Sequence, residues 1–148
     1  MKSSPPADAA PQIELISFRI GETLCGIPIH DVQEINPVSR ITAVPQAPEY
    51  IRGMINLRGQ IVTILDAGEK LGLGKTEKSR ENRIVIVKGK EEPVGLLVSA
   101  MGDVVTTQRA RIEPTPANIG TIQAAFFDGI LNMEGTVIGI LNLEKTLE

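Results

Sequence analysis

Apolar and polar residues alternate with a period of two over much of this chain. In segment 14–20, Ile16, Phe18 and Ile20 alternate with polar residues, which is the period of a half-buried β-strand. Further short runs rich in Ile, Val and Leu predict strands at 24–29, 83–88 and 94–100. Apolar residues at helical spacing are confined to short segments, so the pattern predicts a mainly β protein.

The clearest local pattern lies in the middle of the chain. An apolar run over 53–57 is interrupted by Arg58-Gly59 and resumes as a β-branched run over 61–65. Two apolar runs separated by a short glycine-containing turn predict a β-hairpin. Asp66 follows the second run and is of a residue type that caps helices. The centre of the chain is therefore predicted to be strand, turn, strand and short helix.

Parts of the sequence repeat. Segment 56–66 matches segment 132–142 in apolar character, position by position, at a constant offset, and Gly26-Ile27 similarly matches Gly95-Leu96. Two matches in the same order favour two similar β units, although a chance likeness between two ordinary hairpins would look the same. Two small antiparallel barrels packed together would satisfy this pattern.

The domain organisation follows from these segments. Residues 1–12 are rich in Ser, Pro and Ala without apolar periodicity and predict a disordered tail. Residues 13–148 are predicted to form a single domain made of repeat units at about 13–74 and 82–148, with a short helix at the C-terminus. The charged segment 75–82, KTEKSREN, predicts an exposed linker between the units.

The composition limits the classes of function that are possible. The net charge is −3 and the pI about 5.3, so no basic surface is expected to track phosphates, which argues against a nucleic-acid partner. Cys25 is the only cysteine, which suits a reducing compartment. No apolar run is long enough to cross a membrane, and the start of the chain lacks a signal segment. We therefore expect a cytoplasmic protein that is not inserted in the membrane.

Catalytic and cofactor chemistry finds little support in the residues. His30 is the only histidine and has no ligand cluster around it, so neither a metal site nor a histidine-based nucleophile system is predicted. Segment 72–76, GLGKT, lacks the spacing and the following amphipathic helix of a phosphate-binding loop. We predict no enzyme activity and no cofactor. Binding of a partner protein therefore remains as the predicted function, and a small-molecule-binding β-barrel domain is the less supported alternative.

Two sequence motifs, or phrases, follow one another along the chain. The first is Ile27-Pro28-Ile29 followed by Val32-Gln33-Glu34-Ile35, and the second is Ile51-Arg52-Gly53, Asn56-Leu57-Arg58-Gly59 and the strand ending at Asp66. In order and spacing they resemble the CheW family of chemotaxis adaptors, from about Glu14 to the C-terminus. Thr63 stands where a proline is common in that family, and Ala67-Gly68 where a bulky residue and an arginine are common. These departures bear on the identity of the partner more than on the fold.

The resemblance implies both a fold and a role. The fold would be two five-stranded antiparallel SH3-like barrel subdomains that share a hydrophobic interface. The role would be a cytoplasmic adaptor, within receptor arrays at the inner membrane. It would link the cytoplasmic tip of methyl-accepting chemoreceptors to the regulatory domain of the histidine kinase CheA. An adaptor of a divergent chemosensory pathway, with surface motility or another output, is the alternative.

A charge pair in apolar surroundings is the candidate site. Glu34 and Arg58 lie in the two phrases that carry the resemblance, and an arginine can bind a carboxylate through two parallel hydrogen bonds. The alternative is a plain turn residue and a solvated strand residue. The residues predicted to form the partner-binding surface are Val32, Glu34, Ile35, Gly53, Asn56, Leu57, Arg58, Gly59 and Val98.

Overall fold

The structure is a computed structural model that describes residues 11–119 and 122–148. The predicted tail 1–12 lies outside the described residues except for its last two. Of these, Gln12 already belongs to the first strand, and the carbonyl of Pro11 accepts a hydrogen bond from the Arg109 N–H at 3.1 Å. The tail prediction therefore ends too late by at least one residue, because the pairing of the first strand extends to Gln12.

Strands dominate the described residues, as the alternating pattern predicts. The strands are β1 (Gln12–Ile20), β2 (Thr23–Pro28), β3 (Val32–Pro37), β4 (Ile51–Leu57), β5 (Gln60–Asp66), β6 (Arg83–Val87), β7 (Val94–Val98), β8 (Ala100–Gln108), β9 (Asn118–Ile119), β10 (Ile122–Gln123), β11 (Phe127–Met133) and β12 (Thr136–Leu141). The helices are α1 (Ala67–Lys70), α2 (Leu143–Thr146) and the 3-10 turns η1 (Ile29–Asp31), η2 (Arg109–Arg111) and η3 (Ala124–Phe126). The mainly β fold with few short helices is confirmed.

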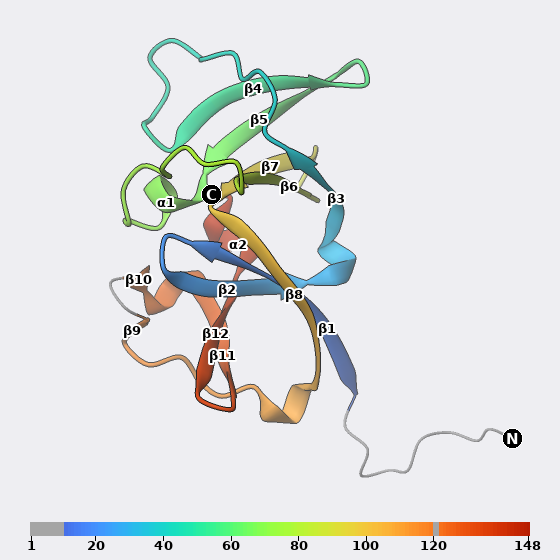
Figure 1. The fold of residues 1–148 in the computed structure, drawn as a ribbon, viewed down its shortest axis with the longest axis vertical. Coiled ribbons are helices and arrows are strands. Elements are labelled where there is room, and N and C mark those ends of the chain that lie inside the picture. The colour runs from blue at the N-terminus through green and yellow to red at the C-terminus, as the bar shows by residue number, and fades with distance from the viewer. Residues whose placement is uncertain (1–10, 120–121) are drawn as a thin grey trace, which may run out of the picture.

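The strands form two five-stranded sheets, which lie one above the other in Figure 1. Sheet I has the order β11-β12-β2-β1-β8, and sheet II has the order β3-β6-β7-β5-β4. All pairs are antiparallel except β12 with β2 and β5 with β7, which are parallel. Two five-stranded sheets are thus present, and each contains one short parallel pairing that the antiparallel prediction did not include. Strands β9 and β10 make a separate two-stranded ribbon.

The two sheets exchange hairpins between the two sequence units. The β1–β2 hairpin belongs to the first unit but pairs with β8 and β12 of the second, whereas β6–β7 of the second unit pairs with β3 and β5 of the first. Both sheets then have the same internal order of equivalent strands. The units read from the sequence are therefore each divided between the two sheets. An offset in sequence identifies equivalent strands but does not say which copy each one pairs with.

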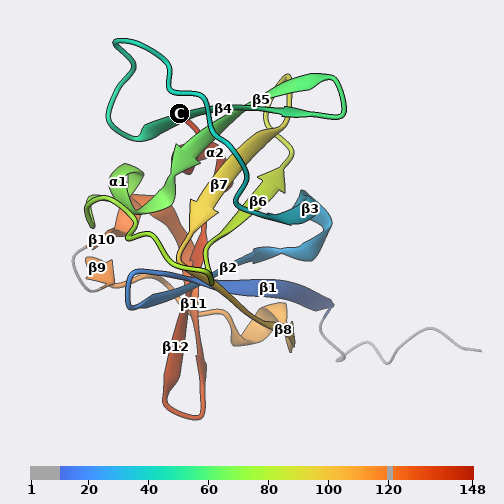
Figure 2. The same cartoon turned by 45° about the horizontal axis from the view of Figure 1, so that its top comes forward.

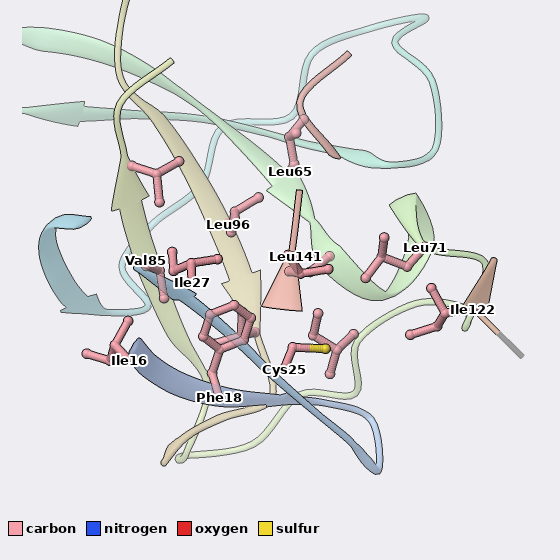
Figure 3. Close-up of a cluster of buried hydrophobic side chains, with 14 of the residues drawn as sticks. Ile16, Phe18, Cys25, Ile27, Leu65, Leu71, Val85, Leu96, Ile122 and Leu141 are labelled. Carbon is pink, nitrogen blue, oxygen red and sulfur yellow. The ribbon is translucent and has the colours of Figure 1, made fainter. Parts of the chain in front are cut away.

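Strands β6 and β7 of sheet II are buried on both faces, which explains why they are apolar at almost every position. In β6, Val85 and Val87 face a cluster shared by both sheets, whereas Ile84 and Ile86 face a cluster enclosed by sheet II alone. The shared cluster contains Phe18 from sheet I and is drawn in Figure 3. Sheet I encloses its own cluster of Ile13, Leu15, Leu131, Ile138 and Ile140. This arrangement produces two curled sheets that share one hydrophobic interface.

Segment 75–82 is more than an exposed linker, which corrects the sequence prediction. Thr76 and Asn82, near its two ends, are buried. The Thr76 backbone N–H and Oγ1 both donate to the Asp66 carboxylate, at 3.0 and 2.6 Å. The charged residues between them hid these two anchors in the sequence, because a short polar side chain gives no sign of burial.

Candidate functional site

The site is built on the tip of the β4–β5 hairpin. Leu57 pairs with Gln60, so the turn consists of Arg58 and Gly59 alone. Their φ angles are +53° and +86°, which are the two positive values that a type I′ turn requires. The Asn56 side-chain oxygen accepts a hydrogen bond from the Gly59 N–H at 2.9 Å and fixes the turn. The predicted hairpin and its glycine turn are confirmed.

Arg58 occupies a backbone conformation that is unfavourable for its type. Left-handed φ is common for Gly, Asn and Asp, but a long side chain with a Cβ pays a steric penalty there. The turn therefore holds an arginine where local conformation alone would favour asparagine or glycine. Because the side chain at this position is 70% exposed, core packing does not explain its presence either.

The Arg58 guanidinium pairs with the Glu34 carboxylate, the arrangement hypothesised from the family resemblance. Arg58 Nη1 donates to Glu34 Oε1 at 3.3 Å, and Nη2 donates to Oε2. The two hydrogen bonds make the parallel geometry expected of an arginine and a carboxylate. Strands β3 and β4 are the two edges of sheet II, so the pair connects an edge strand to the tip of the hairpin that contains the other edge. Figure 2 shows β3 below this tip.

Each member of this pair favours the ionised form of the other. The hydrogen bond from Arg58 lowers the pKa of Glu34, and the same hydrogen bond raises the pKa of Arg58. Both side chains contact solvent, with 70% of Arg58 and 26% of Glu34 exposed. Exposed pairs are screened by water and salt and contribute little to folding stability. What the pair does is hold an ordered cation and anion together on the surface.

The equivalent tip of the β11–β12 hairpin provides an internal comparison. Glu134 and Gly135 have φ angles of +53° and +87°, and the Asn132 side chain accepts from the Gly135 N–H at 3.2 Å. The two tips thus have the same backbone, but the residue equivalent to Arg58 is Glu134. None of the ion pairs found among the described residues includes Glu134. The charge pair belongs to the first hairpin only.

Val32 and Ile35 lie on the same face of β3, three residues apart, because the strand contains a bulge between Val32 and Glu34. Both are half-buried and pack against the cluster shared by the two sheets. Glu34 pairs with Ile86 in the register and lies toward the side of the sheet II cluster. Leu57 is half-buried against that cluster. The structure therefore brings Glu34 and the hairpin tip together, and points Val32 and Ile35 toward the sheet interface.

Two residues of the predicted surface are inside the protein, and their assignment as contact residues is corrected. Val98 is 0% exposed in the shared cluster. Gly53 is buried with a φ of +148°, and a Cβ there would lie 2.2 Å from the carbonyl oxygen of Thr42. Gly53 allows the segment after β3 to pair with β4 through Thr42 and Met54. Both residues shape the fold beneath the surface.

A buried charge network was missed by sequence reasoning. Asp66 is fully buried, and its carboxylate oxygen Oδ2 accepts a hydrogen bond from Arg52 Nη1 at 2.7 Å. It also receives the Glu69 N–H at 3.2 Å, which confirms it as the cap of α1, and both donors of Thr76. Arg52 and Asp66 lie fourteen positions apart on paired strands. The alternation of Arg52 with apolar neighbours was the available signal, since an arginine inside such a run needs a partner.

His30 and Cys25 are the side chains that could carry other chemistry. His30 is 70% exposed, 3.5 Å from the Asp31 carboxylate. Cys25 is buried in the shared cluster, and burial raises the pKa of its thiol to about 12. Residues 11–119 and 122–148 contain no group of three or more His, Cys, Asp or Glu side chains placed to hold a metal ion. In the same residues, no helix has the length and apolar character needed to span a bilayer.

Comparison with known proteins agrees with this geometry. The family model described as "CheW-like domain" matches residues 14–148. "Chemotaxis protein CheW" of Rhizobium meliloti (strain 1021) is 36% identical over 132 residues, which cover 89% of this chain and 85% of the relative. "Chemotaxis protein CheW" of Bacillus subtilis (strain 168) is 27% identical and covers 91% and 86%. The crystal structure of the scaffolding protein TtCheW from Thermoanaerobacter tengcongensis superposes with a TM-score of 0.86 at 34% identity, covering 99% of this chain and 94% of that one.

The two-sheet β fold is that of a scaffolding protein, on which this chain superposes over 99% of its length. The match over residues 14–148 and the relative at 36% identity are more specific. This chain belongs to the CheW family. It is a non-enzymatic scaffold protein of chemotaxis signalling.

Proposed function

We propose that this protein couples the cytoplasmic tip of chemoreceptors to the regulatory domain of the histidine kinase CheA. The partners follow from the family, and the contact surface follows from the charge pair. The proposed surface consists of Glu34, Asn56, Leu57, Arg58 and Gly59. Coupling of this kind needs no reaction in the adaptor, because receptor geometry can bias kinase conformation through two binding contacts.

The observation that carries the proposal is the Glu34–Arg58 pair. Its arginine sits in a conformation unfavourable for an arginine, its side chain is exposed, and its contribution to stability is small. Glu134 has the same positive φ, so what distinguishes Arg58 is its exposed ion pair with Glu34, which presents an ordered charge to a partner. An arginine whose position is already fixed loses little entropy when a partner binds, which favours its use as an anchor.

The half-buried apolar residues of β3 support a second contact. Val32 and Ile35 lie at the edge of the core shared by the two sheets. A partner helix could lay its apolar face against this edge, as amphipathic helices do in hydrophobic grooves. A receptor tip is a helical hairpin, so we assign it to this edge. The kinase domain is then left to the hairpin tip and the edge strands of sheet II.

The deciding experiment measures binding of the purified protein to the isolated kinase regulatory domain and to a receptor cytoplasmic fragment. Arg58→Ala should weaken at least one of these contacts by about tenfold, the effect of losing one anchoring charge at an interface. Glu134→Ala is the matched control, because it changes an exposed residue in the same turn geometry at the other tip. Equal binding by wild type and Arg58→Ala, with unchanged stability, would remove the pair from the contact surface.

An adaptor of a divergent chemosensory pathway is the second candidate. "Protein FrzA" of Myxococcus xanthus is 26% identical over 144 residues, covering 96% of this chain and 89% of that protein, so the family extends to proteins under other names. Binding to kinase and receptor sets from each pathway separates the two candidates. The cognate set should bind more tightly, and assembly with it would place the protein in the cytoplasm beneath receptor arrays.

A further inference from the structure

A pocket lined by basic side chains lies on sheet II, where β3 ends and β6 begins. Its volume is about 580 Å³, and Arg52, Lys78, Arg80 and Arg83 line it. None of the described residues around this pocket is an Asp or Glu. The chain as a whole carries a net charge of −3, so four cations at one pocket are a marked local departure.

The charged residues of segment 75–82 line two different pockets. Lys78 and Arg80 line the basic pocket, whereas Glu77 and Glu81 line a different pocket beside the β1–β2 turn. Lys75 lines that second pocket as well, so the basic pocket takes the basic residues Lys78 and Arg80 of the segment but neither of its acidic residues. None of the salt bridges among the described residues joins Glu77 or Glu81 to a cation of the basic pocket.

The segment that carries these cations is held in place. Besides the two bonds from Thr76 to Asp66, the Asn82 N–H donates to the Ser79 carbonyl at 3.2 Å. The Asn82 side-chain amide donates to the Glu77 carbonyl at 3.0 Å. Lys78 and Arg80 thus start from an anchored backbone, which lowers the entropy lost when a ligand binds.

The cationic groups keep their charge available. Arg83 Nη1 donates to the carbonyls of Arg80 and Asn82 at 2.8 and 2.7 Å, which orders the guanidinium with neutral partners. The ion pairs seen in the described part of the chain include neither Lys78, Arg80 nor Arg83. Arg52 is paired with Asp66, yet 27% of its side chain is exposed. Lys78, Arg80 and Arg83 therefore line the pocket without a carboxylate partner among the described residues.

Beside the polar Ser79 and Asn82, the lining contains apolar side chains that bear on which anions fit. Val38, Ile41 and Leu97 line the same pocket, and Val38 is 43% exposed. A small inorganic anion would satisfy the cations but leave this apolar surface in water. A peptide with carboxylates beside an apolar side chain would cover both.

We propose that this pocket binds an acidic peptide segment of a partner protein, with an apolar residue of the peptide against Val38 and Ile41. The inference goes beyond the adaptor contacts at the hairpin tip and does not depend on them. Charge complementarity sets the choice of occupant, because the charged residues that line the pocket are all cations and the apolar Val38, Ile41 and Leu97 lie among them.

The test uses fluorescence polarisation with labelled peptides of about a dozen residues in which Asp and Glu flank Leu or Phe. One comparison set replaces the acids by Asn and Gln, and another replaces the apolar residue by Ser. Lys78→Glu/Arg80→Glu is the pocket variant. Lys75→Glu/Lys90→Glu is the matched control, since it makes the same charge change at exposed lysines that do not line this pocket.

The pocket variant should weaken binding of the acidic apolar peptides by about tenfold or more, as expected for the loss and reversal of two charge contacts. The control variant and Arg58→Ala should bind within about twofold of wild type. Both comparison sets should bind more weakly than their parents. The proposal is overturned if none of the acidic peptides binds wild type, if both double variants lose binding equally, or if inorganic phosphate binds and displaces the peptide.

Discussion

Replacing Asp66 by alanine should destabilise the fold more than any surface change in this protein. The carboxylate is 0% exposed and accepts from Arg52, from the Glu69 N–H and from both donors of Thr76. Removing it leaves a guanidinium without its counterion, uncaps α1 and frees the buried end of segment 75–82. No other described side chain combines so many polar roles at full burial.

The magnitude follows from these contacts. Breaking a buried ion pair by removing one partner costs about 3–5 kcal/mol, and losing a helix cap costs about 1 kcal/mol. Arg52 remains 27% exposed and can recover part of its hydration, so the lower end applies. We expect Asp66→Ala to lower the free energy of unfolding by about 3 kcal/mol, a large part of the roughly 5–15 kcal/mol typical of a domain.

Urea unfolding followed by far-UV circular dichroism is the assay, because the chain has no tryptophan and one tyrosine. Asn142→Ala is the internal control. Asn142 caps α2 through the Lys145 N–H at 2.8 Å and bonds Asp128 at 2.8 Å, but pairs with no cation. It should lose only about 1 kcal/mol. If Asp66→Ala lost no more than Asn142→Ala, the argument for a stabilising buried network would be wrong.

The remaining predictions concern single positions. Gly53→Ala should destabilise by about 3 kcal/mol in the same assay, since its Cβ would lie 2.2 Å from the Thr42 carbonyl oxygen; Gly21→Ala, with open space at a φ of +62°, should lose about 1 kcal/mol. Arg58→Ala should lower the urea midpoint slightly at neutral pH. Arg58 lowers the pKa of Glu34 in the folded state below its ordinary value of 4.5. The stabilisation by this pair is therefore complete above pH 4.5 and disappears as the pH falls through the pKa of Glu34 in the folded state. A difference in urea midpoint between wild type and Arg58→Ala that grew on acidification would contradict this reasoning. The Cys25 thiol, with a pKa of about 12, should react with a disulfide reagent at neutral pH only as fast as the protein unfolds; fast labelling of the folded protein would refute its burial.

The local elements were predictable because their signals are local. The turn at Arg58-Gly59 needs a glycine that accepts positive φ, and the sequence places Gly59 there between two apolar runs. The helix cap at Asp66 is likewise a matter of neighbouring residues. The Glu34–Arg58 pair was found through the family resemblance, and the structure confirms its geometry. Whether the pair binds a partner stays a prediction.

Contacts between distant segments were not predictable in the same way. Val98 reads like any apolar strand residue, and only the packing of both sheets shows that it is buried. Thr76 and Asn82 look like members of a charged linker until the Asp66 network and the surrounding strands enclose them. The basic pocket also needs the fold, since it combines cations from β4, β6 and segment 75–82.

By itself, the sequence determined most of the longer strands, the two equivalent hairpins with their turns, and the family. Alternation, turn residues and caps act over a few neighbouring positions, so they can be read without a partner strand. Only the tertiary structure decided that the β1–β2 and β6–β7 hairpins exchange between the two units. The two units have nearly the same apolar pattern, so either pairing would satisfy that pattern. The choice depends on how side chains from both sheets fill one shared core, which is a property of the folded chain.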